Sequence, residues 1–174
     1  ADDQSGWSVS MNSDGDRVAI GAYSNDGTGS NAGHVRVYEY SGGSWSQLGS
    51  DIDGEAAGDL SGYSVSLDSD GDRVAIGAPE NEGTGSNAGH VRIYEYSSGS
   101  WSQLGGDIDG EADNDRSGYS VSLNSDGDRV AIGARYNDGN GTSDAGHVRI
   151  YEYSSDSWSQ LGSDIDGEAA GDLS

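Results

Sequence analysis

The chain has 174 residues, a length typical of one domain or of a short array of repeats. It carries 31 aspartates and glutamates against 8 basic residues, a formal net charge of −23, and such a surface would repel the phosphate backbone of a nucleic acid. It has no cysteine, which excludes disulfides and thiolate metal sites, and it has no apolar run long enough to be inserted into a membrane as a helix.

The sequence is three copies of one unit. The segment GWSVSMNSDGDRVAIGA begins at Gly6 and recurs with few changes at Gly62 and Gly118, a spacing of 56 residues. We expect repeats at residues 1–61, 62–117 and 118–174, in one continuous array without a linker. The third copy ends where a fourth would begin, which is expected of a longer array or of a whole number of units.

Within the first unit the apolar residues have a period of two. Residues 7–11 alternate large apolar side chains with serine, which predicts a strand with one apolar face. The NSDGD turn at residues 12–16 predicts a tight hairpin in which the glycine takes a positive φ. Residues 17–22 predict a strand buried on both faces. After a polar loop, residues 34–40 and 44–48 predict a third and a fourth strand.

Four short antiparallel strands in each unit are typical of one blade of a β-propeller. The predicted fold class is therefore all-β, with three four-stranded antiparallel blades of about 56 residues each. Propellers use about four to eight blades, so three cannot close a ring. Closure is expected only by oligomerisation or as part of a longer repeat array, and an open stack of sheets is the alternative.

Residues 62–96 resemble the FG-GAP repeat of integrin α-subunit propellers and of repetitive secreted proteins of aquatic microbes. The motifs that match are GYSV at residues 62–65, the aspartate-rich turn, AIGAP at residues 75–79 and the GHVRIY strand. The resemblance implies a β-propeller, an extracellular or cell-surface location, calcium in some blades, and adhesion or ligand recognition.

The acidic turns are the candidate metal sites of the sequence. Calcium takes six to eight oxygen ligands, and each turn offers at least two carboxylates. The family's calcium loops resemble the longer pattern D-x-D-x-D-G-x-x-D, and Asn12 and Asn124 replace the first aspartate in two copies. The alternative is that the carboxylates cap backbone amides of the turn. The predicted calcium ligands are Asp14, Asp16, Asp68, Asp70, Asp72, Asp126 and Asp128.

Three other polar features recur or stand out. The DIDGE segment at residues 51–55 resembles half of an EF-hand loop but lacks its glutamate at position twelve, so we expect a solvated connection between blades. His34, His90 and His147 share one position of the repeat, and we expect them to pack or to form hydrogen bonds within each blade. Asn140 begins a glycosylation sequon.

The carboxylates and aromatic residues also bear on function. A glycosidase needs two carboxylates with different surroundings, whereas the repeats place each carboxylate in nearly the same surroundings. The recurring tryptophans and tyrosines are expected to fill the layers between blades, and stacking on sugars is the alternative.

We therefore expect a non-catalytic extracellular repeat protein with a structural or adhesive role. Its partners would be copies of itself, joined through blade edges as a homo-oligomer or a filament, or further repeats of a longer chain. The alternative is a propeller module that binds a carbohydrate or a protein, with a glycan or a surface protein as its ligand. Calcium-dependent binding is one version of this alternative. Calcium is the one cofactor expected, and nucleic-acid binding and membrane insertion are not expected.

Overall fold

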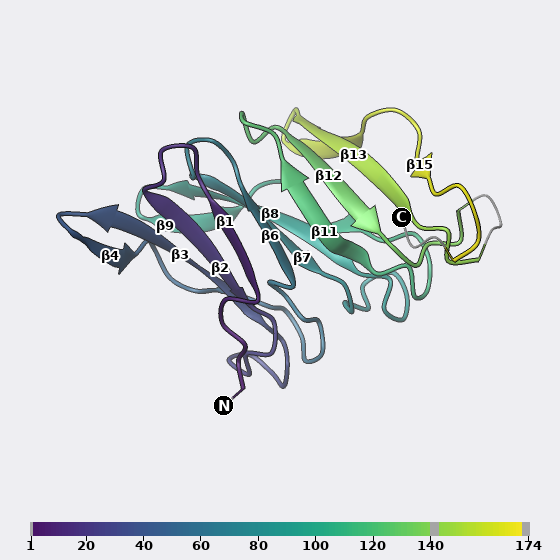
Figure 1. Ribbon diagram of the computed structural model, residues 1–174, viewed down its shortest axis with the longest axis horizontal. Helices are drawn as coiled ribbons and strands as arrows, with labels where there is room; N and C mark the ends of the chain where they lie inside the picture. Colours follow the sequence, from purple (N-terminus) through teal and green to yellow (C-terminus); the bar gives the residue numbers. More distant parts are fainter. Residues whose placement is uncertain (1, 140–142, 172–174) are drawn as a thin grey trace.

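The computed structural model describes residues 2–139 and 143–171. All its named elements are β-strands, and they form three twisted sheets that stand side by side (Figure 1). The predicted all-β fold class is confirmed. The part of the chain described contains no helix that could cross a membrane. The sequon at Asn140 lies outside the described residues.

Each sheet is built from one repeat, with neighbouring strands antiparallel. The first contains β1 (Ser8–Met11), β2 (Arg17–Ala22), β3 (His34–Ser41) and β4 (Ser44–Gln47). The second contains β6 (Ser64–Leu67), β7 (Arg73–Ala78), β8 (His90–Ser97) and β9 (Ser100–Gln103). The third contains β11 (Ser117–Leu123), β12 (Arg129–Ala134), β13 (His147–Ser154) and β14 (Ser157–Gln160).

A short fifth strand in each sheet differs from the prediction. β5 (Ile52–Asp53) pairs with the start of β3, β10 (Ile108–Asp109) with the start of β8, and β15 (Ile165–Asp166) with the start of β13. The expectation of a solvated connection holds for the carboxylates of the first two copies, which are exposed, whereas the side chains of Ile52 and Ile108 are buried because this segment continues the outer edge of the blade. Two residues are too few to show an alternating pattern in the sequence.

The predicted turn between the first two strands is confirmed in all three sheets. Its glycines, Gly15, Gly71 and Gly127, take φ values of 71°, 68° and 65°. This left-handed conformation is accessible to glycine at little cost and strains most other residues. The turn therefore fixes the register of the first two strands.

The sheets pack face to face around their inner strands, β1, β6 and β11, which are neighbours (Figure 1). We call the face that a blade turns toward the next blade its forward face, and the opposite face its backward face. Between the first two blades, Val35, Val37 and Ile52 of the forward face meet Val74 and Ile76 of the backward face. Equivalent residues form the second layer, where Val91, Ile93 and Ile108 meet Val130 and Ile132.

Aromatic side chains of the backward face complete both layers, as the sequence predicts. Trp101 packs against the first layer, and its indole Nε1 donates a hydrogen bond to the carbonyl oxygen of Leu48 at 2.8 Å. Trp158 does the same in the second layer with Leu104, also at 2.8 Å. The two interfaces therefore use the same contacts at the same positions of the repeat.

The backbones of neighbouring blades approach closely at the inner end of each sheet. The hydroxyl of Ser64 donates to the carbonyl oxygen of Gly118 at 2.8 Å. Gly77 lies beside this bond, and a β-carbon at Gly77 would overlap the Gly118 carbonyl and the Ser64 hydroxyl oxygen. Glycine is required there because no side chain fits between the two backbones.

Gly77→Ala is expected to lower the free energy of unfolding by about 1–3 kcal/mol, because overpacking forces the two blades apart. Gly106→Ala is the matched control, since a β-carbon there meets no atom within 4 Å, and its effect should stay below about 0.5 kcal/mol. Urea unfolding measures both. Equal losses in the two variants would contradict the close approach.

Trp101→Phe is expected to lower the free energy of unfolding by about 1 kcal/mol, because the carbonyl of Leu48 loses its donor at the interface. Trp45 occupies the same repeat position on the first blade, against which no described blade packs, and it is 45% exposed. Trp45→Phe should therefore change stability by less than about 0.5 kcal/mol in dilute, unassociated protein. A loss as large as that of Trp101→Phe would argue against the interface described.

Candidate functional site

The predicted calcium ligands lie in the turns between the first two strands of each blade. There the side chains cap the backbone of the turn. The Oδ1 of Asn12 accepts hydrogen bonds from the backbone N–H groups of Asp16 and Arg17, at 3.1 and 2.9 Å, and its Nδ2 donates to Asp16 at 2.8 Å. In the second blade the Oδ1 of Asp68 accepts from the N–H of Arg73 at 3.1 Å. These contacts are those of the turn-capping alternative.

The second turn has an unusual carboxyl group. Burial raises the pKa of Asp68, the nearby carboxyl of Asp72 raises it further, and the backbone hydrogen bond from Arg73 opposes both. Within the described residues, the turn aspartates are not among the side chains gathered in groups of three potential ligands. Calcium binding by Asp14, Asp16, Asp68, Asp70, Asp72, Asp126 and Asp128 stays a prediction.

A different set of ligating side chains meets at the start of the third strand of each blade. The three groups are His34 with Asp51 and Asp53, His90 with Asp107 and Glu55, and His147 with Asp164 and Glu111. In each group the potential ligand atoms lie within 4.8 Å of one another. We call the second and third groups the interblade clusters, because each takes its glutamate from the preceding blade.

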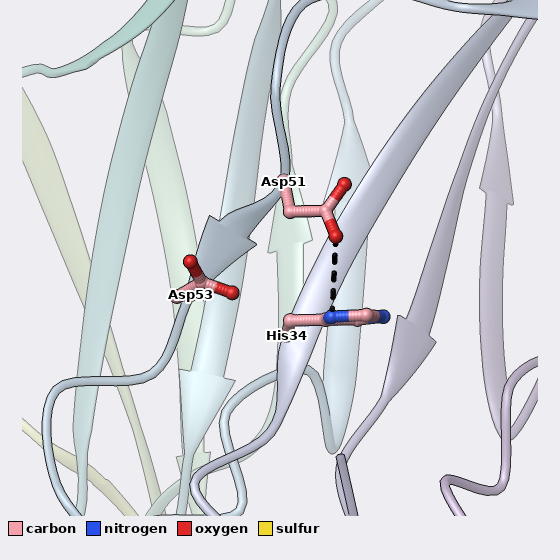
Figure 2. Close-up of side chains that lie close together, drawn as sticks. All are labelled: His34, Asp51 and Asp53. Atoms are coloured by element: carbon pink, nitrogen blue, oxygen red, sulfur yellow. Dashed lines mark ion pairs between the residues drawn. The ribbon is translucent and has the colours of Figure 1, made fainter. Parts of the chain in front are cut away.

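The short fifth strand places these groups. β5 pairs with the start of β3 so that His34 is opposite Asp53, and Asp51 precedes β5. Figure 2 shows the Asp51 carboxylate facing the imidazole of His34, with 3.6 Å between Nδ1 and Oδ2. In the next blade, Nδ1 of His90 lies 3.9 Å from Oε2 of Glu55.

The interblade clusters also contain a buried arginine. Arg92 pairs with Oε1 of Glu55 at 3.3 Å, and Arg149 pairs with Oε1 of Glu111 at 3.1 Å. Burial lowers the pKa of His90 to about 4, and the guanidinium of Arg92 adds to the shift. Burial and the guanidinium of Arg149 lower the pKa of His147 as well. Both imidazoles are therefore neutral at pH 7.

These groups were not predicted from the sequence. The histidine and the DIDGE segment lie apart in the sequence, and the register between β3 and β5 is not visible in a two-residue strand. The available signal was that both motifs recur at a constant separation in every copy. The expectation that the histidines pack within the blade holds for their burial, whereas the Nδ1 of His147 has no hydrogen-bond partner among residues 2–139 and 143–171.

The two end faces of the array expose the residues that its interfaces bury. On the backward face of the first blade, Met11 is 56% exposed, whereas the equivalent Leu67 of the second blade is 7% exposed. On the forward face of the third blade, Ile165 is 57% exposed, whereas the equivalent Ile108 is 4% exposed. The difference arises from the missing neighbour, because the repeat position is the same.

Comparison with known proteins supports the resemblance to FG-GAP repeats. A family model described as FG-GAP repeat matches residues 1–38. No curated protein matches the chain.

Two similar solved structures are lactonases by their descriptions. A putative 6-phosphogluconolactonase from Bacteroides uniformis ATCC 8492 has a TM-score of 0.57 and 12% identity, over 93% of this chain and 41% of that one. A periplasmic gluconolactonase from Pseudomonas aeruginosa has a TM-score of 0.42 and 12% identity, over 94% and 58%. This chain thus spans less than two thirds of the length of either.

At this identity the similarity to the first structure concerns the fold alone. Residues 1–38 carry an FG-GAP repeat, and the second and third sheets repeat the same unit. The chain is thus an array of three blade-like β-sheets, and its first 38 residues match the FG-GAP repeat.

Proposed function

We propose that this protein is a non-catalytic structural building block whose copies associate head to tail. The forward face of the third blade of one copy packs on the backward face of the first blade of the next. The observation that carries this proposal is that the two end faces present, at equivalent repeat positions, the residues that form both internal interfaces.

The apolar parts of the two end faces match one another. Ile165 and Leu161 of the forward face occupy the repeat positions of Ile108 and Leu104, which pack in the second internal layer. Trp45 on the backward face occupies the position of Trp158 in that layer. A second copy therefore supplies each end face with the neighbour that the internal blades already have.

The charged parts match as well. At the internal interfaces a buried arginine pairs with a glutamate of the preceding blade, as Arg92 does with Glu55. Arg36 holds this position on the open backward face, and Glu168 holds the glutamate position at the open forward end. Association of two copies brings these opposite charges together and disfavours the face-to-face pairing of like ends.

Head-to-tail contacts either close into a ring or continue as a filament. Two copies supply six blades, which lies within the range of about four to eight found in propellers. The FG-GAP resemblance supports placing this assembly outside the cell or at its surface, with an adhesive or scaffolding role. Further repeats of a longer chain would cover the same end faces in place of a second copy.

The absence of catalysis is part of the proposal. Catalysis needs groups with differentiated roles, whereas the ligating histidine and aspartate recur in all three blades. The lactonase descriptions belong to structures that share 12% identity with this chain, so they do not bear on its activity.

A ligand-binding module is the second candidate, favoured by a row of aromatic side chains. Trp7 contacts Tyr23 and Tyr63 with ring centroids 5.0 and 5.6 Å apart, and Tyr63 contacts Tyr119 at 4.9 Å. Trp7 is 52% exposed. An exposed indole at the end of an aromatic row provides an apolar face on which a sugar ring can stack.

Light scattering over a range of concentrations tests the association. The wild-type chain is expected to form a dimer or a ladder of larger species. Ile165→Lys should shift the protein to the 17.9 kDa monomer, because a lysine would be buried in the apolar layer. Ser100→Lys is the matched control, since it adds the same charge on an exposed outer hairpin. A wild-type chain that stays monomeric at high concentration would refute self-association.

Glycan-array binding tests the second candidate. Binding that depends on the aromatic row should fall about tenfold or more in Trp7→Ala, because stacking on one ring contributes on the order of 1 kcal/mol or more. Equal binding by wild type and Trp7→Ala would remove this candidate.

A further inference from the structure

Within the described part of the chain, a buried imidazole nitrogen of one interblade cluster has no partner. His147 is 2% exposed, and no described residue forms a hydrogen bond with its Nδ1. Buried polar atoms are almost always paired, so an unpaired one requires an explanation. In the other cluster, the Nδ1 of His90 faces Glu55 at 3.9 Å, which is too long for a hydrogen bond.

The spacing of these atoms is close to that of two ligands of one metal ion. Zinc binds nitrogen at about 2.0–2.1 Å and carboxylate oxygen at about 2.0–2.2 Å in a tetrahedral arrangement, so two ligand atoms on one ion lie about 3.4 Å apart. Nδ1 of His90 and Oε2 of Glu55 are 3.9 Å apart, slightly more than this distance. The Glu55 side chain is 46% exposed, so a small rotation can bring it closer to Asp107.

The buried arginines leave the glutamates free to bind. Arg92 pairs with Oε1 of Glu55, and it is Oε2 that faces His90. An arginine that holds one oxygen of a carboxylate orients the other, as outer partners do in known metal sites. Arg149 and Glu111 form the same pair in the next cluster.

We propose that the two interblade clusters, Glu55–His90–Asp107 and Glu111–His147–Asp164, each bind a first-row transition-metal dication such as Zn²⁺. One imidazole and two carboxylates form a mixed nitrogen and oxygen ligand set, which suits zinc and its neighbours, whereas calcium takes oxygen ligands. A water molecule would occupy the fourth position.

The second of these clusters is reachable from solvent. Glu111 and Asp164 line a surface depression together with Asp138 and Asp166. These carboxylates and the net charge of −23 concentrate cations near the site. An ion can therefore reach the carboxylates of Glu111 and Asp164 without separation of the blades.

The bound ion has a structural consequence. It links a glutamate of one blade to a histidine and an aspartate of the next, and so it clamps the two blades together. This inference goes beyond the proposed assembly, because both clusters are complete within a single chain. The His34 cluster differs, since both its aspartates come from its own blade.

Zinc titration of the chelator-treated chain by calorimetry tests the proposal, with excess Mg²⁺ present to occupy oxygen-only sites. The wild-type chain should bind at least two equivalents of Zn²⁺. His90→Gln/His147→Gln should lose those two equivalents, and His34→Gln, the matched control, should keep them. Long-range ¹H–¹⁵N spectra resolve the chain's three histidines, and Zn²⁺ should shift Nδ1 of His90 and His147.

Two results would overturn the proposal. One is the absence of saturable Zn²⁺ binding by a folded wild-type chain. The other is equal binding by the wild type and His90→Gln/His147→Gln, which would assign the ion to surface carboxylates. Circular dichroism checks that the variants fold. Both titrations are run on dilute monomer, so a failure of self-association would leave the two equivalents in place.

Discussion

The burial of one blade against the next is the interaction on which this structure depends. A blade has two apolar faces and cannot cover either by itself. Ile108 and Ile165 show this, because they occupy the same position of the repeat and yet are 4% and 57% exposed. The two isoleucines differ only in whether a neighbouring blade covers them. Stability in this chain therefore increases with the number of interfaces between blades.

Polar contacts repeat with the same period as the apolar layer and fix the orientation of each blade. The hydroxyl of Ser8 donates to the Gly62 carbonyl at 2.7 Å, and Ser64 donates to Gly118 at 2.8 Å. In these bonds, and in the tryptophan and arginine contacts, the forward face of one blade and the backward face of the next contribute different groups. Neither face is therefore complementary to itself. An interface with this polarity propagates head to tail, which is why the ends of the array match each other and do not match themselves.

The strong negative charge acts against this packing. An excess of carboxylates on a small protein destabilises the compact state by self-repulsion, and bound cations or salt reduce that repulsion. The interblade clusters place some of these carboxylates beside a buried arginine and a buried imidazole. A dication there would neutralise charge at the position where two blades meet.

Much of this architecture could be predicted from the sequence. The alternation in residues 7–11, the NSDGD turn and the constant spacing of the repeats are strong local signals, and they predicted the blades and their number. The short strand Ile52–Asp53 could not be predicted, because two residues have no period. The histidine clusters depend on that strand and on a glutamate from another blade, so no local pattern shows them.

Cross-linking between copies tests the central claim most directly. At the internal interface the carbonyl of Leu48 accepts from the indole of Trp101, so Leu161 of one copy should lie beside Trp45 of the next. Because the chain has no cysteine, Leu161→Cys and Trp45→Cys copies can be mixed with a short bifunctional thiol reagent. The head-to-tail account predicts cross-links between the two variants and none within either alone. Cross-links within one variant alone, or none in the mixture, would contradict it.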